Sequence, residues 1–273
     1  MNKAENFDSN RCQARTERVD FSGNASIYDR RHGAFMSERI VSHMLEVTGL
    51  PLGSRILDVG AGTGRVAIPF ARKGYSVIAV DASWVMLTSL RQKSDGARVS
   101  AVVGDGTQLP FAAGSFDAAV IARLLYLIPD WQRLLLETLR VLKPGSPLFH
   151  EWGNGGSNDD WVQIREKARA LFEAVGVRDP FHPGVRIEED VDAFLAQRGA
   201  RPIAEIPCEP DGHVTMREFL SRIESGECSY TWKIPPSIHA SCVTALLEWA
   251  QAWFDLERPI ASGTVWKIFL LSK

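Results

Sequence analysis

A glycine-rich turn between an apolar run and a helical stretch constrains this chain more than any other feature. The run Arg-Ile-Leu-Asp-Val-Gly, residues 55–60, leads directly into Ala61, Gly62, Thr63 and Gly64. Glycines at positions 60, 62 and 64 allow a tight backbone turn and let a ligand approach without meeting a Cβ atom. A strand, turn and helix of this kind are typical of nucleotide sites in α/β proteins.

The spacing of the glycines bears on the kind of nucleotide. Dinucleotide sites prefer GxGxxG, whose third glycine would fall at position 65, where this chain has Arg65. Asp58 adds a carboxylate beside the turn, which repels phosphate but suits the ammonium and sulfonium of an aminoacyl nucleoside. Asp58 also fits a purely structural role, capping the following loop. Asp81 ends the next apolar run about twenty residues on, where a carboxylate can accept hydrogen bonds from both ribose hydroxyls.

Short apolar runs alternate with helical stretches along most of the chain. Because the runs are continuous and do not alternate with polar residues, they predict parallel strands that helices cover on both faces. We therefore expect an α/β fold with a Rossmann-like, doubly wound, mostly parallel sheet. Pro207 predicts that its strand lies at an edge. The predicted strands are residues 55–60, 76–81, 99–104, 116–121 and 147–152, with 203–208 and 264–271 completing the sheet.

The chain divides into three parts. Residues 1–20 are polar and without periodicity, so we expect a mobile tail. Residues 21–153 are expected to form a lid helix, predicted over 27–47, and the nucleotide-binding core. After a flexible Gly-Asn-Gly-Gly-Ser junction, residues 154–273 complete the sheet and carry an inserted helical cap. The helices predicted there cover residues 161–175, 189–198, 216–223 and 237–254.

Composition argues against several classes of partner. The formal net charge is −2 with 23% charged residues, so no basic surface indicates nucleic acid and a small-molecule partner is expected. The apolar stretches are short and the N-terminus lacks the apolar core of a secretory signal, which indicates a cytoplasmic protein with no membrane partner. The four cysteines form no CxxC pair, so we expect neither a metal site nor a disulfide.

Four segments carry a resemblance to a known family. They read Ile-Leu-Asp-Val-Gly-Ala-Gly-Thr-Gly (56–64), Val-Asp-Ala-Ser (80–83), Gly-Asp-Gly-Thr-Gln-Leu-Pro-Phe (104–111) and Leu-Arg-Val-Leu-Lys-Pro-Gly (139–145). In this order they resemble the class I S-adenosylmethionine-dependent methyltransferases. The resemblance is strongest to the small-molecule branch that includes ubiquinone and menaquinone C-methyltransferases, and it covers about residues 28–152.

The resemblance implies S-adenosylmethionine as cofactor, S-adenosylhomocysteine as product, and a role for each matching residue. Asp81 would hold the ribose, Asp105 would meet the adenine amino group, and Arg123 would contact the methionine part. Tyr28 would pack over the cofactor as part of a lid, or it is a plain surface aromatic. The residues assigned to the cofactor are Tyr28, Asp58, Gly60, Ala61, Gly62, Gly64, Asp81, Ala82, Met86, Asp105, Gly106 and Arg123.

Methyl transfer requires a nucleophile aligned with the methyl group and a site that excludes water. Open parallel sheets bind ligands at the carboxyl ends of their strands, so His150, Glu151 and Tyr126 are the catalytic candidates. Alternation directs only one of His150 and Glu151 toward the pocket, and either can instead be a packed, hydrogen-bonded residue. Aromatic residues at 181–183 and 230–232 favour an apolar or planar acceptor, although they can equally anchor loops.

The sequence therefore predicts an enzyme that methylates O, N or C of a small apolar or aromatic molecule. The alternative is a protein of the same fold that senses the cofactor or catalyses a non-methylating reaction. A nucleic-acid methyltransferase is disfavoured by the near-neutral charge. An NAD-linked dehydrogenase is disfavoured by Arg65 and by the lack of a Tyr-Lys pair at short spacing. Nothing in the sequence indicates an oligomeric state.

Overall fold

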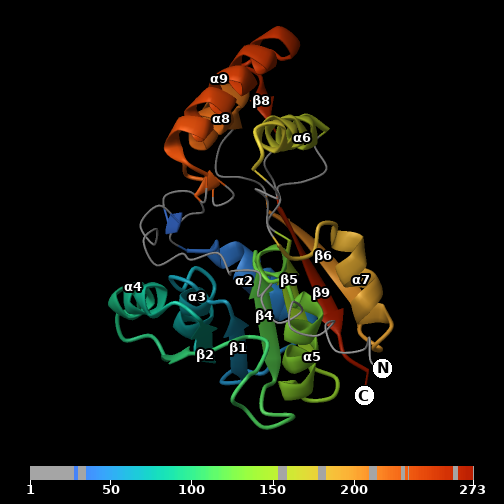
Figure 1. Cartoon of the computed structure of the whole chain (residues 1–273). Helices are drawn as coiled ribbons and strands as arrows, with labels where there is room; N and C mark the ends of the chain where they lie inside the picture. Colours follow the sequence, from blue (N-terminus) through green and yellow to red (C-terminus); the bar gives the residue numbers. More distant parts are fainter. Residues whose placement is uncertain are drawn as a thin grey trace, which may run out of the picture.

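A seven-stranded sheet forms the centre of the described structure (Figure 1). The computed structural model describes residues 28–29, 35–152, 159–177, 183–208, 214–228, 231–232, 234–260 and 264–272. The predicted tail at 1–20, the junction at 153–157 and cap residues 181–182 and 230 lie outside the described residues.

The strand order is β3-β2-β1-β4-β5-β9-β6, in which the first five strands are parallel and β9 is antiparallel to both of its neighbours. The predicted doubly wound, mostly parallel sheet is confirmed, and so is the edge position predicted from Pro207 in β6. The strands are β1 (Arg55–Val59), β2 (Ser76–Asp81), β3 (Val99–Val103), β4 (Ala118–Ala122), β5 (Pro147–Glu151), β6 (Arg201–Cys208) and β9 (Thr264–Leu270).

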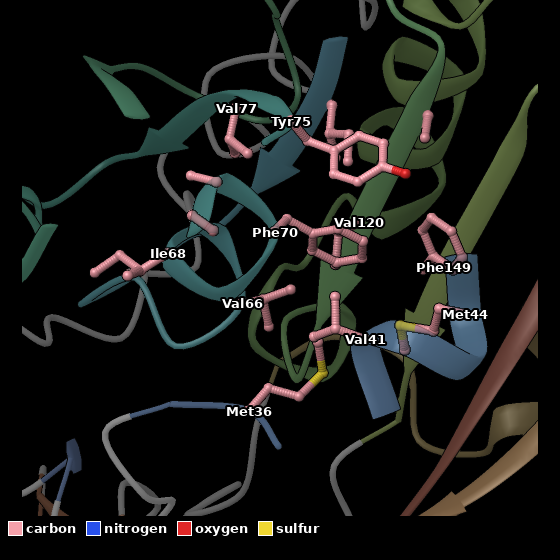
Figure 2. Close-up of a cluster of buried hydrophobic side chains, with 14 of the residues drawn as sticks. Met36, Val41, Met44, Val66, Ile68, Phe70, Tyr75, Val77, Val120 and Phe149 are labelled. Atoms are coloured by element: carbon pink, nitrogen blue, oxygen red, sulfur yellow. The ribbon is translucent and has the colours of Figure 1, made fainter. Parts of the chain in front are cut away.

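One face of the sheet packs against α2 (Glu38–Thr48), α3 (Ala67–Arg72) and α4 (Trp84–Ser94). Figure 2 shows the aromatic centre of this core, where the ring of Phe70 lies 5.8 Å from that of Phe149 and 6.3 Å from that of Tyr75. Burying a Phe side chain contributes about 2–3 kcal/mol. The Tyr75 hydroxyl donates to the Leu50 carbonyl at 2.9 Å, so its one polar atom is satisfied.

The opposite face packs against α5 (Trp131–Val141) and α7 (Glu188–Ala196). Leu134 and Leu135 of α5 are buried there, as are Val191 and Leu195 of α7. Because helices cover both faces, β1 and β4 carry continuous buried runs, as the sequence indicated.

The helix predicted over residues 27–47 is interrupted at residues 35–37, although residues 28–29 are helical. The helix α2 begins at Glu38, and residues 35–37 are not helical. The backbone N–H of Met36 donates to the carbonyl of Arg65 at 2.8 Å, which takes this segment out of a helical hydrogen-bond pattern. The side chain of Met36 still packs in the core beside Val41 (Figure 2). The apolar spacing in the sequence therefore indicated the burial of Met36 but not the interruption of the helix.

A separate helical group lies in the chain between β5 and β9. It consists of α6 (Asp159–Ala174), α8 (Met216–Glu224) and α9 (Pro236–Trp253), with the short strands β7 (Val214–Thr215) and β8 (Pro259–Ile260) paired beside it. The three helices share their own apolar cluster, and Figure 1 shows them grouped at the top, away from the sheet. Each begins and ends within two residues of the helix predicted from the sequence. Within the described part of the chain, no helix has the length and apolar character needed to cross a bilayer.

Candidate functional site

A cavity of about 320 Å³ opens at the carboxyl ends of β1, β2 and β4. Between β1 and β4 the winding of the sheet reverses, and open α/β sheets bind ligands at such a switch point. The lining residues come from the strand ends and the turns after them, from residue 28, from α4, from the 3₁₀ turn η1 (Leu125–Leu127) and from α5. They are Tyr28, Val59, Gly60, Gly62, Val80, Asp81, Ala82, Ser83, Met86, Gly104, Asp105, Gly106, Ala122, Arg123, Leu124, Leu127, Ile128 and Leu134.

The glycine turn forms one wall of this cavity. Gly60 has a φ of 73°, and a Cβ atom there would stand 2.7 Å from the side chain of Leu124. Gly62 has a φ of 53° and nothing within 4 Å of its Cβ position, so it faces open space. A Cβ atom on Gly64 would instead meet Ile68 and Leu90 at 2.8 Å, so that glycine permits helix packing behind the turn. Two of the three predicted glycines thus line the cavity.

Asp81 is fixed at the end of β2 by two backbone groups. Its Oδ2 accepts from the N–H of Gly62 and its Oδ1 from the N–H of Ser83, both at 2.8 Å. Burial raises the pKa of Asp81, and the two backbone hydrogen bonds oppose that rise. Each carboxylate oxygen keeps a further lone pair. The side chain is therefore held at the cavity wall with acceptor capacity on both oxygens.

Asp105 and Gly106 form the neighbouring wall beyond β3. The Oδ1 atom of Asp105 accepts from the backbone N–H of Thr107 at 2.9 Å, which fixes the turn. A Cβ atom on Gly106 would stand 2.9 Å from Leu134 and from Val59, so only glycine fits there without displacing a neighbour. This narrow wall suits a flat group that approaches the backbone closely.

A buried ion cluster lies where β4 and β5 end. The Nε of Arg123 donates to Oε1 of Glu151 at 3.1 Å, and Arg65 donates to the other carboxylate oxygen. The hydroxyl of Thr264 donates to Oε1 of Glu151 at 2.9 Å. Burial alone would raise the pKa of Glu151, but the two guanidinium groups outweigh it and hold the pKa below its usual range. Glu151 is therefore an anion with three donors, and Arg123 is the member of the cluster that lines the cavity.

The N-terminal turn at residues 28–29 packs onto the glycine turn. Tyr28 lines the cavity, and burial raises the pKa of its phenol. Asp29 accepts from the Thr63 hydroxyl and pairs with Lys93 at 2.9 Å, which anchors the turn on both sides. The sequence analysis gave Asp29 no role, because its partners lie 34 and 64 residues away.

Asp58 lies behind the turn, outside the cavity wall. It is 2% exposed, and its Oδ2 has no hydrogen-bond partner among the described residues. Burial, together with the charge of Asp81, raises its pKa to about 7 although Arg65 lowers it. Of the other predicted cofactor residues, Ala61 and Gly64 also stay out of the wall, whereas the remaining nine line it.

None of the three predicted catalytic residues reaches the cavity wall. His150 is 1% exposed, and burial, with the charge of Lys267, lowers its pKa to about 4. It shares the side of β5 on which Leu148 packs, and its ring lies 6.4 Å from that of Trp152. Tyr126 packs edge-on against the same Trp152 at 6.1 Å. Glu151 faces the arginines described above and is not available as a base.

Sequence reasoning missed an apolar part of the wall. Leu124, Leu127 and Ile128 follow β4, and Leu134 projects from α5. A run of leucine and isoleucine directly after a strand at the switch point was the signal that could have found them. Ser83, whose hydroxyl caps α4 by accepting from the N–H of Met86, also lines the cavity.

Part of the chain is similar to known proteins. Residues 56–145 match the family model described as a methyltransferase domain. A demethylmenaquinone methyltransferase of Renibacterium salmoninarum is 41% identical over 106 residues, which cover 38% of this chain and 44% of that protein. An uncharacterized methyltransferase of Mycobacterium tuberculosis is 29% identical over 179 residues, or 65% of this chain and 68% of that protein. The match thus spans less than half the length of the first relative.

Solved structures show the same fold. The Haemonchus contortus phosphoethanolamine N-methyltransferase 2, solved with S-adenosylhomocysteine, has a TM-score of 0.54 at 20% identity, covering 92% of this chain and 57% of that one. The [4+2]-cyclase SpnF has a TM-score of 0.56 at 22% identity, covering 86% of this chain and 80% of that one. The chain is similar to class I S-adenosylmethionine-dependent methyltransferases, among them menaquinone-type members, which confirms the resemblance of the four segments.

Proposed function

We propose that this chain uses S-adenosylmethionine to methylate O, N or C of a small apolar or aromatic acceptor. The observation that carries the proposal is the arrangement of Asp81 against the glycine turn. A carboxylate with acceptor capacity on both oxygens suits the two ribose hydroxyls of a nucleoside. Asp81 and Asp105 both line the cavity, and two carboxylates there would repel a diphosphate.

The cavity residues fit the cofactor part by part. Asp81 would hold the ribose, Asp105 would accept from the adenine amino group, and the narrow wall at Gly106 would face the flat base. The open space at Gly62 would take the methionine part, whose carboxylate would pair with Arg123. Asp58 does not reach the cavity wall, so it would act on the cofactor from behind the glycine turn without touching it.

The bound cofactor supplies a methyl group on a positively charged sulfur. The chain has to hold an acceptor in line with that methyl group and keep water away. The apolar wall of Leu124, Leu127 and Ile128 suits an apolar or aromatic acceptor beside the cofactor. Among the described residues that line the cavity there is no histidine, so an acceptor that is already ionised at neutral pH needs no base from this wall.

The helices α6, α8 and α9 would cover the acceptor. Of these helices α6 follows β5, whose carboxyl end lies beside that of β4, whereas α8 and α9 follow β6; together the three carry their own apolar core. A unit that packs within itself can shift relative to the sheet without exposing the main core. This supports a cap that closes over the acceptor and excludes water.

The test is a screen of phenolic, quinonoid, amine and terpenoid acceptors, with release of S-adenosylhomocysteine as the readout. We expect release that depends on one acceptor class and is absent without acceptor. A folded protein that binds S-adenosylmethionine but releases no S-adenosylhomocysteine with any class would contradict the proposal.

A second candidate is a non-methylating reaction in the same site, since the [4+2]-cyclase SpnF shares the fold. A cofactor labelled in its methyl group separates the two. Methyl transfer predicts labelled product in equal amount to S-adenosylhomocysteine. The second candidate predicts a converted substrate without label while the cofactor stays intact.

A further inference from the structure

Glu151 is tied to three separate elements although it does not touch the cavity. Its carboxylate accepts from Arg65 behind the glycine turn, from Arg123 after β4 and from Thr264 at the start of β9. The side chain is 1% exposed, so these contacts are shielded from water and from salt. Buried charges are held in this way only when several donors satisfy them.

The backbone around Arg123 is fixed by the same residue. The N–H of Arg123 donates to the carbonyl oxygen of Glu151 at 2.8 Å, while its side chain meets the carboxylate. Arg123 has a φ of 54°, a left-handed conformation that L side chains rarely adopt. A strained residue persists where its surroundings hold it, and such residues gather at binding sites.

Glu151 lies where the chain leaves the sheet toward α6, and Thr264 lies where the chain returns to the sheet after α8 and α9. The chain between them also includes α7 and β6, which pack on the sheet and pair within it. The hydrogen bond between the two side chains, at 2.9 Å, therefore joins the end of β5, which leads to α6, with the start of β9, which follows α8 and α9. The same carboxylate thus connects these two strand ends with an arginine of the cavity wall.

We propose that Glu151 is a positioning residue, which holds the Arg123 guanidinium where it meets the cofactor carboxylate and links it to the strand ends that lead to α6 and follow α9. This inference rests on the proposed function, in which Arg123 pairs with the methionine carboxylate. It replaces the catalytic role predicted for Glu151 from the sequence. Glu151 acts through Arg123 and touches neither cofactor nor acceptor.

The test compares two ligands that differ only in the carboxylate, S-adenosylhomocysteine and its decarboxylated analogue, by calorimetry. Glu151→Gln keeps the size of the side chain and removes its charge. We expect the Kd of S-adenosylhomocysteine to rise about tenfold and that of the analogue to change less than about twofold. The control is Glu137→Gln, because Glu137 also binds two arginines but lies outside the cavity wall. Its ratio of the two Kd values should equal that of the wild type.

A double variant separates positioning from general stabilisation. If Glu151 acts through Arg123, adding Glu151→Gln to Arg123→Gln leaves the ratio of the two Kd values unchanged. Equal weakening of both ligands by Glu151→Gln would overturn the inference and leave the proposed cofactor site intact. Equal affinity of the wild type for both ligands would instead overturn the proposed role of Arg123, and the inference with it.

Thr264→Val provides the same test if Glu151→Gln does not fold. It removes one donor to Glu151 and keeps the shape of the side chain. We expect the affinity for S-adenosylhomocysteine to fall about threefold with that of the analogue unchanged. Loss of affinity for both ligands by the same factor would again contradict the positioning role.

Discussion

Replacement of Asp81 by alanine tests the assignment of the ribose site. Asp81 already accepts one backbone hydrogen bond on each oxygen, at 2.8 Å, which leaves one lone-pair direction on each for a ribose hydroxyl. Hydrogen bonds to a charged group contribute about 1.5–3 kcal/mol each, and water replaces part of this in the variant. We therefore expect a loss of binding free energy on the order of 2 kcal/mol or more, or a rise of roughly 30-fold in the Kd of S-adenosylhomocysteine.

Asp81→Ala also removes acceptors for the N–H groups of Gly62 and Ser83, so the fold loses stability as well. Asp117→Ala is the matched control. Asp117 accepts from the backbone N–H of Arg55 at 2.8 Å and pairs with Lys143, at the opposite end of the sheet. Its variant should lose stability and keep its affinity. A folded Asp81→Ala variant whose Kd stays within about twofold of the wild type would refute the ribose assignment.

Three further predictions follow from burial and backbone geometry. The pKa of Asp58 is raised to about 7, so the stability gained from its protonation is complete below about pH 4 and is lost as the pH rises to about 7. In Asp58→Asn the unfolding free energy, measured by urea titration, should fall less steeply with pH over that window, by up to about 1 kcal/mol per pH unit. Equal pH slopes for the variant and the wild type would contradict this. Gly60→Ala should destabilise the fold by about 1 kcal/mol or more beyond Gly53→Ala. Both glycines have positive φ, but only a Cβ atom at position 60 meets a neighbour, the side chain of Leu124. Equal shifts in melting temperature for the two variants would refute the packing contribution. His150→Leu should keep methyl transfer and lose less than about 1 kcal/mol of stability, because the imidazole nitrogens have no hydrogen-bond partner among the described residues. Loss of turnover in the folded variant would restore a catalytic role for His150.

The core of the fold was predictable because its signals are local. The strand β1, the turn after it and the acidic end of β2 are encoded within about thirty residues, where apolar runs and glycine spacing are direct readouts of burial and backbone geometry. The nine predicted cofactor residues that line the cavity all stand on such local features or on the family resemblance.

The environment of β5 could not be predicted in the same way. Alternation along the strand showed that His150 and Glu151 face opposite sides, but the partners of Glu151 are 28, 86 and 113 residues away. A buried carboxylate becomes a base or an ion-pair anchor according to those distant partners. The interruption of the predicted helix at residues 35–37 has a related cause, since the bond from Met36 to Arg65 is a tertiary contact that helical spacing does not report.

A crystal structure of the chain with S-adenosylhomocysteine tests the central claim most directly. The ligand should occupy the cavity at the ends of β1, β2 and β4, with both ribose hydroxyls within hydrogen-bond distance of Asp81 and the adenine beside Asp105. Its carboxylate should lie against Arg123. A ligand bound elsewhere, or turned so that its ribose does not meet Asp81, would contradict the account.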